Sequence, residues 1–150
     1  MKALYIGSFD PFTIGHYEIL KQAEELFDEV IICFARNLNK KRRFSALTCA
    51  NAINHIDGKT RKIIHSDELT PYIMEEENCE YLIRGLRNTS DYLYEENLYQ
   101  MYKQINPEIK CVYLRGNHVS STFVYELYKR DLDMITKYIP YDINFLREEF

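Results

Sequence analysis

Short apolar runs alternate with amphipathic stretches along the chain. We expect strands over residues 3–6, 30–35, 61–64, 81–83 and 111–114. The second of these is apolar at every position, which is the pattern of a parallel strand covered on both faces. Between the strands, the spacing of apolar residues predicts helices over 15–27, 45–56 and 91–105. A further helix is expected to open at Pro71 behind a Thr70 cap, and residues from 120 onward are expected to be mostly helical.

Five strands that alternate with helices predict an α/β fold, namely a Rossmann-like, doubly wound, five-stranded parallel sheet in a single domain, residues 1–150. No internal repeat and no linker rich in Pro, Gly or Ser divides the sequence. In such a sheet, ligands bind at the carboxyl ends of the strands, near the point where the strand order reverses. Candidate functional residues are therefore sought in the loops that follow the strands.

The predicted helix over 91–105 is apolar around much of its circumference. Leu98, Met101, Tyr102 and Ile105 form one stripe, and three further tyrosines and Leu93 broaden it. A stripe this wide indicates burial on two sides. The second side is covered either by a loop of the same chain or by another subunit.

Composition and charge exclude several classes of protein. A net charge of −4 and a pI near 5.6 argue against nonspecific nucleic-acid binding, which needs a positive surface. No apolar run approaches the roughly 20 residues that span a bilayer. Ser8 and Asp10 interrupt the N-terminus before the apolar core of a signal peptide can form. We therefore expect a cytoplasmic protein with neither nucleic acid nor membrane as a partner.

The cysteines do not form a metal-binding motif. Cys33, Cys49, Cys79 and Cys111 are too far apart for a metal knuckle, and three of them lie in or beside apolar stretches. We expect buried or half-buried thiols in a reducing compartment, and no metal site made by the protein's own residues.

The most informative segment, GSFDPFTIGH over residues 7–16, follows the first predicted strand. Gly7 lets the backbone turn sharply off the strand, and Ser8 offers a hydroxyl and an N–H. Gly15 permits close approach at a helix start, where His16 lies beside unpaired N–H groups and the positive end of the helix dipole. Together these groups make an anion site suited to phosphate.

Two further segments follow later strands. LIRGLR over 82–87 leaves the fourth strand and precedes Asp91, Tyr94 and Glu95, and VSST over 119–122 follows the fifth strand. Together with GSFDPFTIGH, these segments resemble the signatures of the nucleotidyltransferase superfamily that carries a (Thr/His)-x-Gly-His motif. Threonine at the first motif position makes the chain most similar to the phosphopantetheine adenylyltransferase family. The resemblance covers nearly the whole chain.

The resemblance implies transfer of the adenylyl group of ATP to 4′-phosphopantetheine, giving dephospho-coenzyme A and pyrophosphate in coenzyme A synthesis. A phosphate oxygen that is already ionised attacks the α-phosphorus in line, so the protein must supply cations and N–H donors rather than a general base. Mg²⁺ is expected as the usual companion of ATP. The resemblance also implies a homo-oligomer, specifically a hexamer.

Residue roles are carried over by the same resemblance. His16 is expected to hydrogen-bond the α-phosphate and stabilise the transition state, with Ser8 between ATP and the acceptor phosphate. The catalytic set is His16, Lys40, Arg84 and Arg87. The acceptor-binding set is Ser8, Lys40, Leu69 and Arg84. The ATP-binding set is Ser8, Phe9, His16, Gly85, Leu86, Arg87, Glu95, Gly116, Asn117, His118, Val119, Ser120, Ser121 and Thr122.

Two departures from the family pattern concern the acceptor. Glu68 lies where the family tends to have an apolar residue, and Tyr102 lies where a smaller amide side chain is common. The phosphate-handling residues are retained while residues near the acceptor arm differ. Two alternatives therefore stay open, namely the same reaction on a different phosphate acceptor, and a noncatalytic sensor that binds a nucleotide or coenzyme A.

The basic residues also have structural interpretations. Arg84 and Arg87 are candidates for ion pairs with the acidic residues at 91 and 95. In the run 40–43, only Lys40 is expected to bind phosphate, while Arg42 and Arg43 are expected to form a solvated surface.

Overall fold

The computed structural model describes residues 1–36 and 39–147. Its strands are β1 (Lys2–Gly7), β2 (Glu29–Ala35), β3 (Ile63–Ser66), β4 (Tyr81–Leu86) and β5 (Lys110–Arg115). Its helices are α1 (Ile14–Leu26), α2 (Ala46–Ile53), α3 (Thr70–Glu77), α4 (Thr89–Ile105), α5 (Ser121–Arg130), α6 (Leu132–Ile135) and α7 (Asn144–Arg147).

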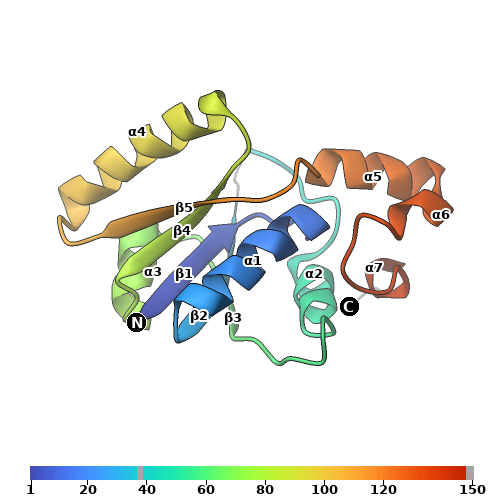
Figure 1. Cartoon of the computed structure of the whole chain (residues 1–150), viewed down its shortest axis with the longest axis horizontal. Coiled ribbons are helices and arrows are strands. Elements are labelled where there is room, and N and C mark those ends of the chain that lie inside the picture. Colours follow the sequence, from blue (N-terminus) through green and yellow to red (C-terminus); the bar gives the residue numbers. More distant parts are fainter. Residues whose placement is uncertain (37–38, 148–150) are drawn as a thin grey trace.

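The five strands form one parallel sheet in the order β3-β2-β1-β4-β5 (Figure 1). The chain builds outward from β1 through β2 to β3, and then returns to place β4 on the other side of β1. The strand order therefore reverses between β1 and β4. This confirms the predicted Rossmann-like, doubly wound sheet.

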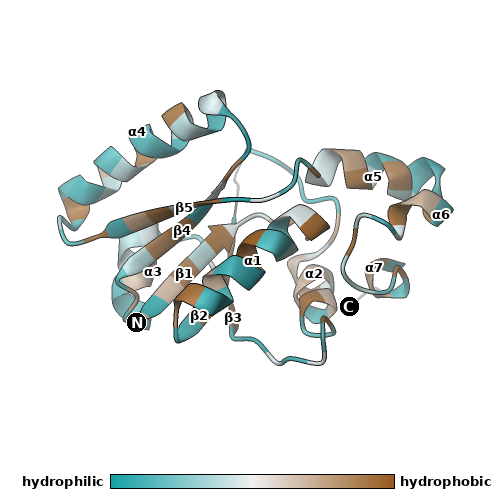
Figure 2. Cartoon of the chain, viewed as in Figure 1, coloured by the Kyte–Doolittle hydropathy of each residue, from teal (hydrophilic) through white to brown (hydrophobic). Residues whose placement is uncertain are grey.

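Helices cover both faces of the sheet. Alternate residues of β1 point to opposite faces, so that Ala3 and Tyr5 join one buried cluster and Leu4 and Ile6 join the other. The first cluster packs under α1, α2 and the C-terminal helices, and the second under α3 and α4. Hydrophobic residues are concentrated in the strands, whereas α1 and α4 carry both kinds of residue (Figure 2).

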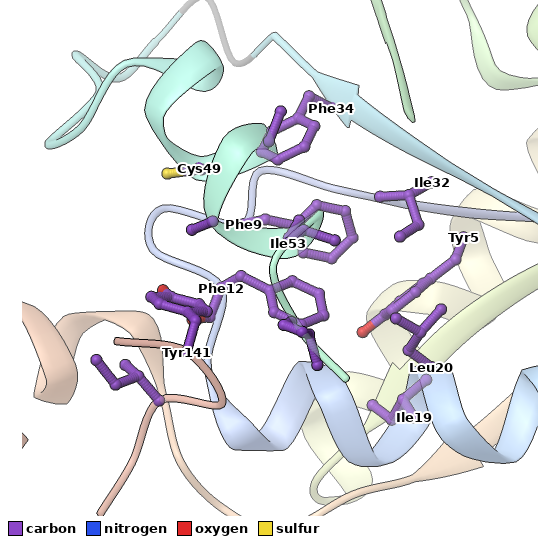
Figure 3. Close-up of a cluster of buried hydrophobic side chains, with 14 of the residues drawn as sticks. Tyr5, Phe9, Phe12, Ile19, Leu20, Ile32, Phe34, Cys49, Ile53 and Tyr141 are labelled. Carbon is purple, nitrogen blue, oxygen red and sulfur yellow. The ribbon is translucent and has the colours of Figure 1, made fainter. Parts of the chain in front are cut away.

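The loop between β1 and α1 is held in place by aromatic packing. Phe9 lies between Phe12 and Phe34, with ring centroids 5.4 Å away in each case (Figure 3). The buried hydroxyl of Tyr141 donates a hydrogen bond to the Phe12 carbonyl at 2.6 Å. A segment that carries the phosphate-site motif is therefore anchored in the core, although it is a loop.

The third strand begins two residues later than predicted. Arg61 is buried in the α2–β3 connection, where its Nε and Nη2 donate to the Glu24 carboxylate on α1 at 3.0 and 3.1 Å. Its backbone N–H donates to Asn54 Oδ1 rather than to a neighbouring strand. Pairing with β2 therefore covers Ile63–Ser66 instead of 61–64.

The predicted Thr70 cap is wrong. Leu69 occupies the N-cap position of α3 and makes no side-chain cap bond. The Thr70 hydroxyl instead contacts the Tyr102 hydroxyl of α4 at 3.3 Å, and this links the two helices on that face of the sheet.

The wide apolar surface of α4 is largely uncovered by the described part of the chain. Leu93, Tyr94 and Met101 are 58%, 64% and 62% exposed, whereas Glu95 is the buried residue of the helix. The helix also starts earlier than predicted, because the Asn88 side chain accepts a hydrogen bond from the Asp91 N–H at 2.9 Å and caps it. No loop among residues 1–36 and 39–147 covers this surface of the helix.

Two further sequence expectations concern the cysteines and membrane-spanning segments. Cys33, Cys49 and Cys79 are buried free thiols, and Cys111 is half-buried. Within the described residues, no helix is both long enough and apolar enough to cross a bilayer.

Candidate active site

A cavity of about 380 Å³ opens at the carboxyl ends of β1 and β4, where the strand order reverses. Its walls come from both strands, the first turns of α1 and α5, the start of α4 and the loop after β5. The lining residues are Tyr5, Ile6, Gly7, Ser8, Phe9, Gly15, His16, Ile19, Arg84, Gly85, Arg87, Asp91, Glu95, Gly116, Asn117, Val119, Ser120, Ser121 and Thr122.

The start of α1 fixes the orientation of His16. The Thr13 hydroxyl accepts a hydrogen bond from the Gly15 N–H at 3.1 Å, and the Thr13 N–H donates to His16 Nδ1 at 3.0 Å. These reciprocal bonds form a capping box. Because Nδ1 accepts, the neutral ring carries its proton on Nε2 and keeps an N–H donor on its other edge.

The surroundings of His16 keep its ring uncharged. Burial, followed by the charges of Arg87 and Arg84, lowers the pKa of His16 from 6.5 to about 4. The rings of Phe9 and Phe12 lie 5.2 and 5.3 Å away between centroids. At neutral pH the residue is therefore a fixed neutral hydrogen-bond donor.

Two arginine–carboxylate ion pairs form part of the cavity wall. Arg84 donates from Nε and Nη2 to the Glu95 carboxylate, at 2.8 Å in both bonds. Arg87 donates from its backbone N–H and its Nε to Asp91 Oδ2 at 3.0 and 3.1 Å. The ion-pair interpretation of both arginines is therefore correct in geometry, and all four side chains line the cavity.

The first turn of α5 forms the opposite wall. The Ser120 hydroxyl accepts a hydrogen bond from the Phe123 N–H at 3.1 Å and caps the helix. The Ser121 hydroxyl donates to the Pro11 carbonyl at 2.7 Å, which ties the helix to the loop after β1. Helix N–H groups without intrahelical partners and two hydroxyls, those of Ser121 and Thr122, thus lie together at the cavity.

Two features of the cavity wall bear on ligand binding. A Cβ on Gly15 would lie 3.0 Å from the Val119 carbonyl, so glycine allows α1 to approach the loop after β5 closely. Asn117 Oδ1 is buried without a hydrogen-bond partner among the described residues. This oxygen lies 3.2 Å from the position that a Gly15 Cβ would take, so it too limits what can stand at residue 15.

Lys40 lies outside this cavity. It is exposed and lines a neighbouring cavity of about 370 Å³, which shares Ser8, Ser121 and Thr122 with the first. It also lines a cavity of about 470 Å³ that includes Phe34 at the ends of β2 and β3. Lys40 thus lines two neighbouring cavities rather than the main one.

Three other predicted residues are not brought into the main cavity. Leu86 lines a separate hollow with Arg87. His118 is exposed, and the Leu69 side chain, 55% exposed, lines none of these cavities. The remaining predicted nucleotide-binding residues all line it.

Sequence reasoning missed the apolar part of the wall. Tyr5, Ile6 and Ile19 line the cavity, yet each reads as an ordinary core residue of a strand or helix. The position of Ile6 directly before Gly7, at the end of the first strand, is the signal that could have identified it.

Comparison with known proteins identifies the family. A cytidylyltransferase-like family model matches residues 4–127. The phosphopantetheine adenylyltransferase of Cytophaga hutchinsonii is 32% identical over 152 aligned positions, which cover 94% of this chain and 97% of the relative. That of Coprothermobacter proteolyticus is 37% identical, covering 89% and 87%.

Solved structures share the fold at low identity. Thermotoga maritima TmcAL, bound with alpha-thio ATP, has a TM-score of 0.67 at 11% identity and is matched over 93% of this chain and 53% of its own. A bifunctional NMN adenylyltransferase/ADP ribose pyrophosphatase from Francisella tularensis has a TM-score of 0.65 at 19% identity, over 97% and 48%. The chain spans about half the length of each, and at these identities the likeness concerns the fold alone. The family model and the curated relatives together show that the chain belongs to the cytidylyltransferase-like family and, within it, to the phosphopantetheine adenylyltransferases, which are nucleotidyltransferases.

Proposed function

We propose that the protein transfers the adenylyl group of ATP to the phosphate of 4′-phosphopantetheine. The acceptor oxygen forms a bond to the α-phosphorus, the bond from the α-phosphorus to the β-bridging oxygen breaks, and pyrophosphate leaves. The observation that carries this proposal is the arrangement around His16. A neutral, oriented N–H donor shares one cavity with two arginines and the first turn of a helix.

The proposed mechanism is electrostatic stabilisation of an in-line displacement. The Nε2–H of His16 would donate to a non-bridging α-phosphate oxygen, where negative charge increases in the transition state. Arg84 and Arg87 would offset the charge of the two reacting polyanions, and the start of α5 would bind phosphate through its N–H groups. Lys40, in the adjoining cavity, would bind the acceptor phosphate from the outer side.

We also propose that Mg²⁺ arrives bound to ATP, as part of the substrate. Within the described residues, no group of three His, Cys, Asp or Glu side chains could hold a metal ion. The carboxylates of Asp91 and Glu95 in the cavity are already paired with arginines. Mg²⁺ binds well to phosphate oxygens and retains several waters, so the ATP phosphates are its natural ligands here.

A second candidate is the same reaction on a different phosphate acceptor. The observation that favours it is the contact between the Tyr102 and Thr70 hydroxyls, on the half-buried side of α4. A tyrosine here leaves less room for the arm of an acceptor than the smaller amide that is common in the family. Binding of 4′-phosphopantetheine separates the two candidates, because an enzyme for another acceptor would not bind the pantetheine arm.

The test of function is pyrophosphate release from MgATP, with and without 4′-phosphopantetheine. We expect release that depends on the acceptor and falls about 10²- to 10³-fold in His16→Ala, with ATP affinity little changed, because the contact strengthens mainly in the transition state. His55→Ala, a change at an exposed histidine outside the cavity, is the matched control. ATP binding without release would contradict this acceptor and leave the second candidate and a noncatalytic sensor, which a panel of other phosphate acceptors separates.

We further propose a cytoplasmic homo-oligomer. The reduced thiols and the proposed substrates fit the cytoplasm. The exposed apolar residues of α4, Leu93, Tyr94 and Met101, fit a surface that a second copy of the chain covers.

A further inference from the structure

The basic loop 40–44 is fastened to the loop that follows β1. Both carboxylate oxygens of Asp10 accept backbone N–H bonds from it, from Arg43 at 2.7 Å and from Phe44 at 2.8 Å. Asp10 thus holds the backbone of the basic loop, and Arg42 Nη2 also lies 3.7 Å from its Oδ1 as an ion pair.

Arg42 and Arg43 are not the simple solvated residues that their sequence predicts. Arg42 is half-buried and donates from Nη1 to the Ser8 carbonyl at 2.7 Å and from Nε to the Phe44 carbonyl at 2.9 Å. The side chain therefore bonds mainly to backbone carbonyls. The Arg42 side chain thus links the basic loop 40–44 to the loop after β1.

Arg43 spans a wider gap. Its Nη1 donates to the Asp10 carbonyl at 3.2 Å, and its Nη2 donates to the Thr122 hydroxyl on α5 at 2.7 Å. The Tyr125 ring lies beneath the guanidinium, with its centroid 5.3 Å from Cζ. One planar group therefore connects the loop after β1 to the first turn of α5.

We propose that Arg43 is a positioning residue for adenylyl transfer: it sets the spacing between the Ser8–Asp10 loop and the first turn of α5. The proposal rests on the proposed function. Ser8 and Thr122 come from these two segments and both line the main cavity, where the proposed reaction would have the phosphates of its substrates contact both segments at once. A shift of about 1 Å between such walls can lower turnover as much as 100-fold.

Arginine suits this role better than lysine. Its fork presents two donors in a fixed plane, whereas an ammonium group is a point charge on a flexible stem. Because Arg43 is exposed, its bonds contribute little to the stability of the fold. Loss of Arg43 is therefore expected to affect turnover far more than unfolding.

The experiment is a double-mutant cycle on kcat/KM for pyrophosphate release, using Arg43→Ala, Thr122→Val and the double variant. We expect Arg43→Ala to lower kcat/KM about tenfold or more, mostly through kcat, with the midpoint of thermal unfolding unchanged within about 2 °C. The double variant should lose less than the product of the two single losses, although Thr122 also lines the cavity itself. Arg43→Lys should recover only part of the loss, because one ammonium cannot hold both acceptors in a fixed plane.

Three outcomes would overturn the proposal: single losses that multiply in the double variant, full recovery in Arg43→Lys, or a loss matched by Arg130→Ala, the control at the far end of α5.

A second experiment measures the same double-mutant cycle on the Kd of ATP by calorimetry, without an acceptor. If wild-type protein releases no pyrophosphate, the proposed function fails on its own. Non-additive changes in the Kd of ATP would still support the role of Arg43, and additive changes would reject it.

Discussion

His16 serves the fold and the proposed chemistry with different edges of one ring. Its Nδ1 completes the capping box of α1 by accepting from the Thr13 N–H at 3.0 Å, and its Nε2 remains for a ligand. Protonation of Nδ1 would break this bond and place a charge beside Arg84 and Arg87. The cap and the arginines thus favour the same tautomer.

We expect His16 to remain neutral well below the usual range for histidine. Its pKa is lowered to about 4, so a histidine-labelled NMR titration should show the Nε2–H tautomer unchanged from pH 7 to pH 5. His55 serves as an internal reference for an exposed histidine. A midpoint near 6.5 for His16 would contradict the burial argument.

The same shift in pKa has a consequence for stability. Between about pH 6.5 and pH 4 the unfolded state binds a proton that the native state does not, so the native state loses stability as the pH falls through that window. His16→Asn should reduce this loss, which urea unfolding at several pH values would measure.

Motif residues could be predicted to lie together, and the acidic partners of Arg84 and Arg87 were among the candidates, but the sequence did not decide between these partners and a phosphate. Strand ends meet at one edge of a parallel sheet, which is why Ser8, Arg84 and Ser121 converge although they are distant in sequence. Whether Arg84 binds Glu95 or a phosphate, and where Arg43 reaches, depends on side-chain geometry across elements. Hydrophobic periodicity carries no information about such contacts.

At the scale of elements, the connection between α2 and β3 depends on a buried ion pair. The Arg61 guanidinium is bonded through two nitrogens to Glu24, and this ties the connection to α1. The predicted strand included Arg61 because local sequence does not reveal a partner 37 positions earlier. The existence of the strands and their doubly wound parallel arrangement were predictable, whereas this boundary was set by a tertiary contact.

Removal of Glu24 should leave the buried Arg61 guanidinium without its counterion. We expect Glu24→Ala to lower the free energy of unfolding by about 3 kcal/mol, near the lower end for buried pairs because the carboxylate is partly exposed. Glu25→Ala, at an exposed neighbour, should change it little. Urea unfolding measures both, and equal effects would show that Arg61 does not depend on Glu24.

At the scale of the whole molecule, the described residues cover only one side of α4, which packs on the sheet and α3. The apolar residues of the helix were predicted to be buried on two sides, and Leu93, Tyr94 and Met101 are exposed. Burial of the second side therefore stays a prediction, and the periodicity of one chain does not say what would cover it.

If a second copy covers α4, a charge at its centre should separate the subunits. We expect Met101→Glu to lower the molar mass measured by light scattering on a sizing column, because an ionised carboxylate is costly to bury. Leu47→Glu, at an equally exposed position on α2, should leave the mass unchanged. A wild-type protein that elutes as a monomer would exclude the oligomer.

The ion pairs of the cavity also determine how a polyanion enters and leaves. Arg84 and Arg87 already have counterions in Glu95 and Asp91, so a phosphate would meet positive charges that are already paired rather than vacant. In the proposed reaction, an arginine that turned from its carboxylate to a phosphate would leave that carboxylate to repel the anion, and departure of the product would let the pair form again. Such an exchange of counterions would moderate affinity for polyanions and favour release of the product.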